Sequence, residues 1–323
     1  MDIENALSRV KELLPGLEIA ENEPMKNHCS FKTGGPVRAF VAPQSINSLS
    51  IICCALKENE VAPFMLGNGT NVVFPDEGNE NLIVMSTEKL QGIRLLDETH
   101  IYAESGVSLS KLASFALDNS LTGLEFASGI PGTVGGGVMM NAGAYGGELK
   151  DVIESVTIYY LPEQRLYEFT NEQCKFSYRH SFFQGYSGNV ILNAVFNLSK
   201  GDKNEISAKM KELNERRRDK QPLDLPSCGS AFKRPEGYYA AALIEECGLK
   251  GYKVGGAMVS EKHAGFIVNT GDATSKDLYD LMEHVRKEVY EQKGIGLQSE
   301  IILISQDFKL VDDTPQAPRN TVF

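Results

Sequence analysis

Glycine is concentrated in one segment of twenty residues. Residues 128–147 read SGIPGTVGGGVMMNAGAYGG and hold eight of the chain's 30 glycines. Flexible linkers are polar and rich in Ser and Gly, whereas this segment also carries residues that favour burial, such as Val134 and Met139. A buried glycine-rich segment presents backbone N–H groups without a Cβ in the way, and such groups bind phosphates and other anions. The segment therefore predicts one wall of a site for an anionic ligand.

A second glycine-rich loop, Gly67-Asn68-Gly69, follows a run of residues typical of a strand. It is not the dinucleotide-binding fingerprint, because Val72 stands at the place of the third glycine and Pro75 prevents a helix from beginning directly after the loop. The chain has no GxxxxGK[ST] motif either. Two separate glycine-rich loops that match neither motif indicate a large diphosphate ligand lying across both, and FAD is such a ligand.

Arg179, Ser230 and Glu300 are polar residues whose side chains could take part in catalysis, and nothing else in the sequence selects these three over other polar residues. Arg179, in Tyr178-Arg179-His180, stays charged and can form two parallel hydrogen bonds to a carboxylate. Ser230 carries a hydroxyl that can give up a proton, and Glu300 stands next to apolar strand residues. Taken singly, each has an ordinary alternative: a surface arginine, a serine that caps a turn, or an exposed carboxylate at the start of a strand.

Composition limits the function classes. The net charge of −11 and the pI of about 5.1 argue against a large nucleic-acid site. The one dense basic run, from Arg216 to Lys220, ends a segment with helical character, where cations suit the helix dipole. The six cysteines include no CxxC pair, so we expect no zinc site. No signal peptide and no apolar run of about 18 residues is evident, so we expect a cytoplasmic protein without membrane insertion.

The periodicity of apolar residues predicts an alternation of helices and strands. The N-terminal sixteen residues form an amphipathic helix pattern closed by Pro15-Gly16, and a strand–helix–strand opening at 37–66 indicates one buried parallel pair. Residues 81–104 read as short antiparallel strands. The other expected helices are 108–119, one ending near 220, 238–247 and 274–293, and the other expected strands are 155–160, 166–169, 190–198, 257–260, 266–268 and 300–305.

Six motifs then occur in a fixed order along the chain. They read LGNGTN (66–71), GLEFASGIPGTVGGGVMMNAGAYGGE (123–148), YRHSFF (178–183), GSAFKRP (229–235), KHAGFIVN (262–269) and LQSEI (297–301). Together they resemble the UDP-N-acetylenolpyruvoylglucosamine reductases, the MurB family of flavoenzymes in peptidoglycan precursor synthesis. The resemblance runs from about Asn27 to Ile304, and the ordered set is far more specific than any one motif.

The resemblance implies an α+β protein. Its expected architecture is a two-subdomain FAD-binding fold of the vanillyl-alcohol-oxidase type, followed by an α/β substrate-binding domain. We expect the FAD-binding subdomains at residues 1–85 and 86–200, the substrate-binding domain at 201–308 and a flexible tail at 309–323. The polar residues between Lys200 and Lys203 agree with the boundary near residue 201.

The resemblance also implies a reaction. NADPH reduces a non-covalently bound FAD, a hydride passes from the flavin to C3 of an enolpyruvyl ether on a UDP-sugar, and C2 receives a proton. Ser230 matches the family's proton donor, and Arg179 and Glu300 match the residues that stabilise the enolate. The expected partners are therefore the UDP-sugar and NADPH, with no nucleic acid, in a monomer or weak homo-oligomer.

The same resemblance assigns the residues that bind the ligands. The expected FAD contacts are Gly67, Asn68, Gly69, Thr70, Asn71, Ser128, Gly129, Ile130, Gly132, Thr133, Gly135, Gly136, Asn141, Ala142 and Gly143. The expected substrate contacts are Tyr178, Arg217, Lys220, Lys233 and Arg234. Many relatives have asparagine at the position of Arg234, so its role stays open.

Several alternatives remain at this stage. An FAD-dependent oxidase of the same fold would keep both glycine-rich loops but would not need Arg179, Ser230 and Glu300 together. A flavin- or nucleotide-binding protein without catalysis would have lost at least one of the three. The segment between Phe183 and Val190 is short, which is typical of the second, shorter-loop type of the family and leaves open what closes the site. The preference for NADPH over NADH is also open.

Overall fold

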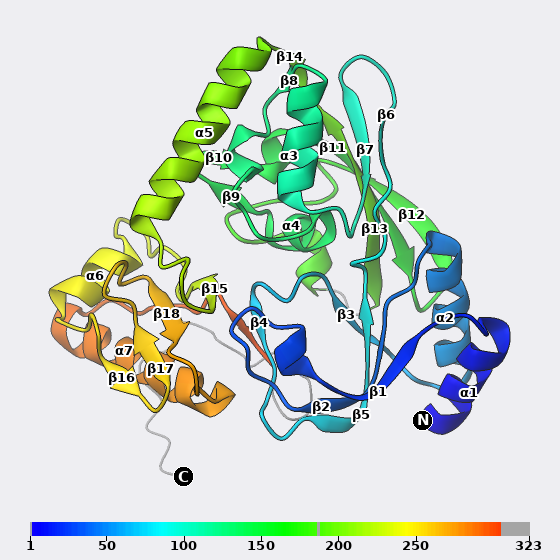
Figure 1. Ribbon diagram of the computed structural model, residues 1–323, viewed down its shortest axis with the longest axis horizontal. Coiled ribbons are helices and arrows are strands. Elements are labelled where there is room, and N and C mark those ends of the chain that lie inside the picture. Colours follow the sequence, from blue (N-terminus) through cyan, green and yellow to red (C-terminus); the bar gives the residue numbers. More distant parts are fainter. Residues whose placement is uncertain (1, 186–187, 305–323) are drawn as a thin grey trace. The chain divides into compact units, whose positions relative to one another are not determined.

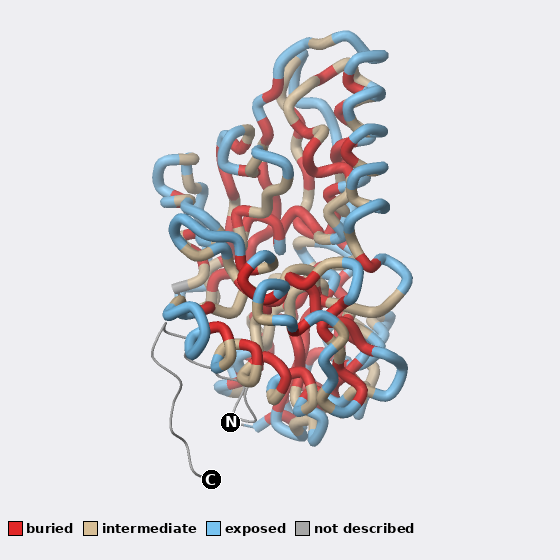
Figure 2. Tube along the Cα trace, turned by 90° about the vertical axis from the view of Figure 1, so that its left-hand side faces the viewer, coloured by how far each residue is buried: buried red, intermediate tan, exposed pale blue. Residues whose placement is uncertain are grey.

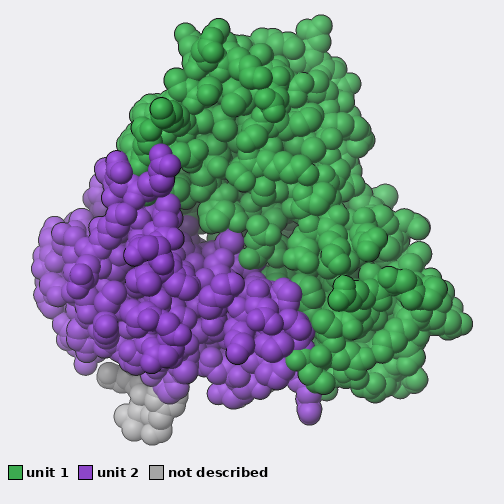
Figure 3. Space-filling model, in the orientation of Figure 1, with its two compact units in different colours: residues 1–22, 38–68, 81–217 green, residues 23–37, 69–80, 218–323 purple. Residues whose placement is uncertain are grey.

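The computed structural model describes residues 2–185 and 188–304. The chain divides into two units, which are coloured separately in Figure 3. The first unit holds residues 1–22, 38–68 and 81–217, and the second holds residues 23–37, 69–80 and 218–323. The sequence predicted three domains instead. Those domain boundaries stay a prediction. The predicted tail at 309–323 lies outside the described residues.

The first sheet has the strand order β1-β2-β5-β3. Its strands are β1 (Ile19–Pro24), β2 (Pro36–Val41), β5 (Asn79–Ser86) and β3 (Phe64–Leu66). Helices α1 (Ile3–Leu13) and α2 (Ile46–Glu58) pack against each other, and their apolar faces share one core with the sheet. The helix expected within the strand–helix–strand opening at 37–66 is confirmed as α2, and its start is fixed by a capping box between Ser45 and Ser48.

The pairing in this sheet differs from the prediction. The strand at 37–41 and the strand at 61–66 are not hydrogen-bonded neighbours, because β5 lies between them. β5 is also parallel to β3, with Phe64 opposite Val84, whereas the sequence predicted antiparallel strands throughout 81–104. The physical reason is visible in burial: every residue of β5 from Leu82 to Ser86 is buried, so the strand requires a central position.

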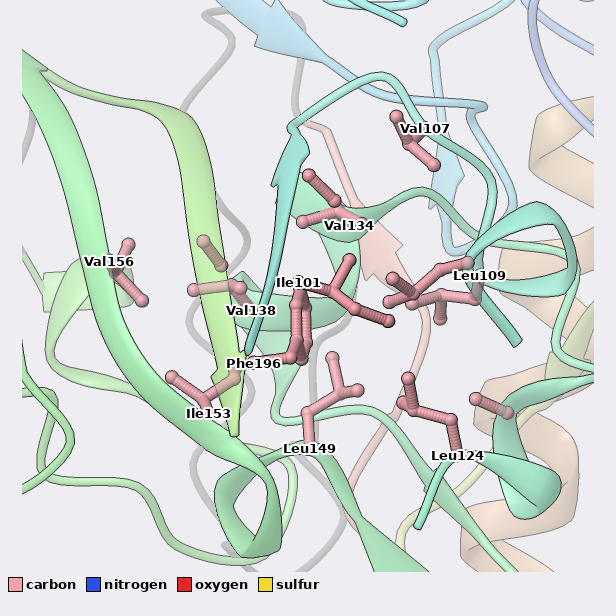
Figure 4. Packing of buried hydrophobic residues seen from close by; sticks show 14 of the residues in the cluster. Ile101, Val107, Leu109, Leu124, Val134, Val138, Leu149, Ile153, Val156 and Phe196 are labelled. Atoms are coloured by element: carbon pink, nitrogen blue, oxygen red, sulfur yellow. The ribbon is translucent and has the colours of Figure 1, made fainter. Parts of the chain in front are cut away.

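The second sheet is antiparallel, with the order β12-β11-β13-β7-β6 (Figure 1). Its strands are β12 (Arg165–Thr170), β11 (Ile153–Tyr160), β13 (Asn189–Asn197), β7 (His100–Glu104) and β6 (Ile93–Leu95). Helix α3 (Leu109–Asp118) begins where predicted, because the hydroxyl of Ser108 accepts a hydrogen bond from the Lys111 N–H. The core beside this sheet joins Ile101 and Phe196 from the strands to Val138 and Leu149 (Figure 4).

The glycine-rich segment is partly helical, which the sequence did not predict. Residues Val134–Met140 form helix α4, capped by Thr133, and Val134 and Val138 are buried on its inner face. Glycine costs a helix free energy relative to alanine, and close packing explains why it is present here. A Cβ on Gly135 would lie 2.9 Å from the Ser105 Cβ, and one on Gly137 would lie 2.8 Å from a methyl group of Leu149.

The second unit is built on a four-stranded antiparallel sheet, order β15-β18-β17-β16, with helices α6 and α7. The long helix expected at 274–293 is confirmed, and a capping box fixes its start, because Thr274 and Asp277 exchange hydrogen bonds with each other's backbone N–H. The elements are β15 (Ser227–Ser230), β18 (Phe266–Asn269), β17 (Ala257–Val259), β16 (Lys253–Val254), α6 (Ala240–Glu246) and α7 (Ser275–Lys293). A parallel pair, β4 (Val72–Val73) and β19 (Ile302–Leu303), belongs to the same unit.

Short elements complete the fold. They are η1 (Met25–Asn27), β8 (Leu121–Thr122), η2 (Glu125–Ala127), β9 (Gly143–Ala144), β10 (Gly147–Glu148), η3 (Leu149–Asp151), η4 (Phe182–Gly185) and β14 (Ser199–Lys200). The long, charged helix α5 covers Lys203–Lys220. Figure 2 colours the chain by burial, with buried residues red, and α5 contributes only Ile206 and Leu213 to them. Among the described residues, none of the helices combines the length and the apolar character that crossing a bilayer requires.

The neighbouring glycines of α4 predict opposite effects of the same substitution. We expect Gly135→Ala to lower the free energy of unfolding by about 1–3 kcal/mol, because its methyl group would press on Ser105. Gly136→Ala is the matched control: its Cβ has only Thr133 Oγ1 nearby, at 3.6 Å, so we expect a gain of up to about 1 kcal/mol from helix propensity. Urea denaturation measures both, and equal losses in the two variants would contradict the packing argument.

A pH-dependent contact joins the second sheet at His100. Its Nδ1 lies 2.8 Å from Asp97 Oδ2 and its Nε2 lies 2.8 Å from Glu154 Oε2. The hydrogen bond to Asp97 raises the pKa of His100, and hydrogen bonds from the Thr99 N–H and from His100 lower the pKa of Asp97 to about 2.

The stabilisation from His100 should therefore be present at acid pH and lost as the pH rises through its raised pKa. We expect His100→Gln to lower the melting temperature by about 1–3 °C at pH 5.5, in line with the modest worth of exposed ion pairs, and by less at pH 9. Thermal unfolding of both proteins measures this difference. A gap that stays constant or grows with pH would show that the contact is not ionic.

Candidate active site

Within the first unit, the structure brings Gly67 and Asn68 of one glycine-rich loop against the other glycine-rich segment. A Cβ on Gly67 would lie 2.7 Å from the hydroxyl of Thr133, and the side-chain amide of Asn68 donates to the Pro131 carbonyl at 3.2 Å. Two segments far apart in the sequence therefore form one surface, as a ligand lying across both would need. Loops of short polar and glycine residues fit a diphosphate because their backbone N–H groups are accessible.

The remaining residues predicted to line this surface differ in their exposure and in the contacts that they already make within the protein. Gly136 is exposed, and its backbone is the part of α4 that a ligand can approach. The space beside Gly129 is filled by another part of the protein, since a Cβ there would lie 2.5 Å from Asn214 Oδ1. Ser128 is buried, and its hydroxyl donates to the Glu125 carbonyl at 2.8 Å. Ile130 packs on the core, and Gly132 accepts a backbone hydrogen bond from Leu109.

Gly69, Thr70 and Asn71 belong to the second unit. Gly69 has φ +59°, and a Cβ there would lie 1.9 Å from the His28 carbonyl oxygen, so the protein itself requires glycine. The side-chain amide of Asn71 donates to the carbonyl of Glu300 at 2.9 Å, and the Asn71 carbonyl accepts from Ile302. Asn71 therefore holds the segment that carries Glu300, a role that no sequence signal revealed.

Arg179 lies in a tight turn between Ser177 and His180, whose backbones exchange two hydrogen bonds of 3.0 and 3.1 Å. Its φ of +53° is rare for a residue with a side chain, so the turn must be held by its surroundings. The guanidinium donates from Nη2 to the Gly143 carbonyl at 3.1 Å and lies 5.1 Å from the ring centre of Tyr178. Tyr178 itself is exposed. The hydrogen bond to Gly143 thereby restrains the orientation of the guanidinium.

Three residues predicted to contact FAD directly follow the C-terminal end of α4. Asn141 is fully buried, and its side chain bonds to Glu148, Ser177 and Lys150. Ala142 donates to the Gly137 carbonyl, and a Cβ on Gly143 would lie 2.6 Å from the Gly147 carbonyl oxygen. Their contact with a cofactor stays a prediction, while their bonds within the protein are evident.

Ser230 and Glu300 lie on adjoining stretches of the second unit. The Glu300 N–H donates to the carbonyl of Ala231, the residue after Ser230, at 2.9 Å, and Phe232 forms a bridge with Ser299. The pairing of β15 with β18 is irregular between Ser227 and Ser230, where Gly229 adopts φ +79°. Such irregularities redirect a side chain. The positive φ of Gly229 is favourable only for glycine, so the identity of this residue helps to set the backbone direction at Ser230.

The predicted substrate contacts are divided between the units. Arg217 is partly buried beside Gly129 in the first unit, and burial lowers the pKa of its guanidinium, which nevertheless stays charged at neutral pH. Lys220 ends α5 and is exposed. The Lys233 backbone donates to the Gln298 carbonyl, and Arg234 stacks 4.0 Å from the ring centre of Tyr239.

Tyr145 is a residue of this region that sequence reasoning did not assign to the site. It adopts φ +54° in the hairpin between β9 and β10, and the residue is 39% exposed. The guanidinium carbons of Arg216 and Arg217 lie 5.0 and 5.9 Å from its ring centre. The sequence held little sign of this turn: Gly146 suits a two-residue hairpin, but tyrosine is not among the residues that such a turn favours before the glycine.

Comparison with known proteins places this arrangement in a family. Residues 37–168 match the FAD binding domain, and residues 221–304 match the C-terminal domain of UDP-N-acetylenolpyruvoylglucosamine reductase. The UDP-N-acetylenolpyruvoylglucosamine reductase of Caldanaerobacter subterraneus subsp. tengcongensis is 47% identical over 93% of this chain and 98% of its own length. That of Limosilactobacillus reuteri is 46% identical over 90% and 97%.

A solved structure agrees with these sequence relatives. The crystal structure of UDP-N-acetylenolpyruvylglucosamine reductase (MurB) from Thermus caldophilus is similar with a TM-score of 0.75 and 31% identity, over 89% of this chain and 98% of that one. The α+β fold and the family predicted from the six motifs are thus confirmed. The chain belongs to the UDP-N-acetylenolpyruvoylglucosamine reductase family of flavin-dependent oxidoreductases.

Proposed function

We propose that this protein reduces UDP-N-acetylglucosamine enolpyruvate to UDP-N-acetylmuramate, with non-covalently bound FAD as cofactor and NADPH as co-substrate. The observation that carries the proposal is the placement of Ser230 and Glu300 on adjoining backbone stretches in a chain of this family. A proton donor and a carboxylate side by side suit a reduction that adds a proton next to a carboxyl group. The proposed compartment is the cytoplasm, where NADPH is available.

The chain's residues must manage the charge that such a reduction creates. When bound, FAD supplies the hydride, and NADPH renews it. Addition of hydride at C3 leaves negative charge on C2 and on the attached carboxylate, and a fixed cation lowers the free energy of that state. Arg179 is the proposed cation, because a guanidinium can bind a carboxylate through two parallel hydrogen bonds.

Ser230 is the proposed proton donor to C2. A serine hydroxyl is a very weak acid in water, so it can protonate only a strongly basic carbon and only when it is held in line with that carbon. An enolate carbon is basic enough. The irregular pairing at Gly229 and the hydrogen bond between Glu300 and Ala231 fix the backbone on both sides of Ser230. Glu300 is proposed to support the substrate carboxylate and the charge that develops on it.

Binding of the ligands is proposed to use the surfaces described above. The joined loops at Gly67 and Thr133, with the accessible backbone of Gly136, would hold FAD through N–H groups and short polar side chains. Tyr178, Arg217, Lys220, Lys233 and Arg234 would contact the substrate, and the cations among them suit its diphosphate. The protein is proposed to act as a monomer or a weak homo-oligomer.

A product assay tests this function directly. Purified holoenzyme is incubated with NADPH and UDP-N-acetylglucosamine enolpyruvate, and mass spectrometry of the nucleotide sugar should show a gain of two hydrogens for each NADPH consumed. Omission of the enolpyruvyl substrate should stop NADPH oxidation under anaerobic conditions. Unchanged nucleotide sugar together with oxygen-dependent formation of hydrogen peroxide would instead support an oxidase.

Substitution of Ser230 separates proton delivery from cofactor chemistry. We expect Ser230→Ala to leave reduction of the flavin by NADPH unchanged but to lower kcat of the full reaction by about 10²- to 10⁴-fold, which is the usual worth of a general acid. Ser230→Cys, which keeps a proton on a side chain of similar shape, should retain part of the activity. Stopped-flow absorbance of the flavin measures both steps.

Ser227→Ala is the matched control, since Ser227 lies on the same strand on the other side of the irregular pairing. Its kcat should stay within about twofold of the parent, because Ser227 is half-buried and is not among the residues proposed to contact the substrate or the flavin. If Ser230→Ala also keeps its full kcat, then Ser230 is not the proton donor.

A further inference from the structure

Asn141 stands at the junction of two functional segments. It ends α4 in the left-handed conformation, with φ 43° and ψ 59°, and none of its surface is exposed. Asparagine tolerates this conformation better than other residues with a side chain. A buried amide must find partners for two N–H donors and one carbonyl acceptor.

The side chain of Asn141 has all of these partners within the first unit. Its Nδ2 donates to the Ser177 carbonyl at 2.9 Å and to Glu148 Oε2 at 3.0 Å, and its Oδ1 accepts from the Lys150 N–H at 3.0 Å. Ser177 is the first residue of the turn that carries Arg179. The amide thus fastens the end of α4 to the base of that turn.

The turn itself needs such fastening. Arg179 adopts φ +53°, an unfavourable conformation for a residue with a Cβ, and it persists only where neighbouring contacts hold it. A second tether is Gln184, whose side-chain amide donates to the Arg179 carbonyl at 3.1 Å and to the Met139 carbonyl at 2.9 Å. Both tethers connect the Arg179 turn to the last residues of α4.

We propose that Asn141 is a positioning residue for Arg179, acting on the reaction through the orientation of that guanidinium. The proposal rests on the proposed role of Arg179 in binding the substrate carboxylate. The Arg179 guanidinium donates to Gly143, two residues after Asn141, so one short segment sets both the backbone and the side chain of Arg179. Loss of the Asn141 amide would release the base of the turn and let the guanidinium leave its bond to Gly143.

Asn141→Asp is the sharpest probe, because it keeps the shape of the side chain but replaces its N–H donors with an acceptor. A carboxylate there would face the Ser177 carbonyl and the Glu148 carboxylate, both of which require a donor. Asn171→Asp is the matched control. Asn171 donates in the same manner to the carbonyls of Lys150 and Ile153, and neither bond involves the Arg179 turn.

A double-mutant cycle in the holoenzyme tests the coupling. We expect Asn141→Asp to lower kcat, measured per bound FAD, at least tenfold while the rate of flavin reduction by NADPH stays within twofold of the parent. Added to Arg179→Ala, it should lower kcat by less than a further twofold, since coupled residues are non-additive. Asn171→Asp should show neither effect. An equal loss of kcat in both backgrounds would overturn the proposal, because Asn141 would then act independently of Arg179.

A structural readout separates this proposal from the proposed function. The crystal structure of Asn141→Asp should lack the bond from Arg179 Nη2 to the Gly143 carbonyl. If that bond is retained, Asn141 does not position Arg179, whatever the kinetics show. If the bond is lost but Arg179→Ala retains full kcat, the positioning is correct and the proposed role of Arg179 fails.

A second variant covers the case in which Asn141→Asp does not fold. Gln184→Glu removes the second tether, the amide donor to the Arg179 carbonyl. The same cycle with Arg179→Ala should again be non-additive, with a loss of kcat of at least fivefold and unchanged flavin reduction. Full additivity in this cycle would contradict the proposal that hydrogen bonds between the turn and α4 determine the orientation of the Arg179 guanidinium.

Discussion

The first unit depends on the close approach of helix α4 to its neighbours. Three consecutive glycines, Gly135 to Gly137, make this helix intrinsically weak, and it is held by burial of Val134 and Val138. The absence of side chains lets its backbone meet Ser105 on one side and Leu149 on another. Gly136 is left exposed between them. The same constraint therefore fixes the core and leaves one strip of bare backbone beside the loop at Gly67.

Two amide side chains connect these segments to the residues proposed for catalysis through hydrogen bonds. Asn141 ties the end of α4 to the turn of Arg179, and Asn71 ties the segment before β4 to Glu300. In each case a short polar side chain bonds to a backbone carbonyl of a segment distant in sequence. Such bonds specify one conformation of a loop more than they add stability, because the net gain of a neutral hydrogen bond is small.

The sequence predicted the helices well where their ends carry their own signals. Ser108 and Thr274 cap helices at the predicted residues, whereas the helix at Val134 was missed because its glycines read as a loop. The central position of β5 and the pairing of Glu300 with Ala231 are long-range, so local patterns do not contain them. The family was recognised because six motifs share one order, while the tethers through Asn71 and Asn141 required the folded chain.

The central claim is that flavin chemistry in this protein serves an enolpyruvyl substrate. The most direct measurement is an anaerobic stopped-flow experiment, in which NADPH reduces the bound flavin and UDP-N-acetylglucosamine enolpyruvate is then added. The account predicts a rapid return of the oxidised-flavin spectrum together with formation of UDP-N-acetylmuramate. A flavin that stays reduced until oxygen is admitted would contradict it, and would mean that Arg179, Ser230 and Glu300 act on a different substrate.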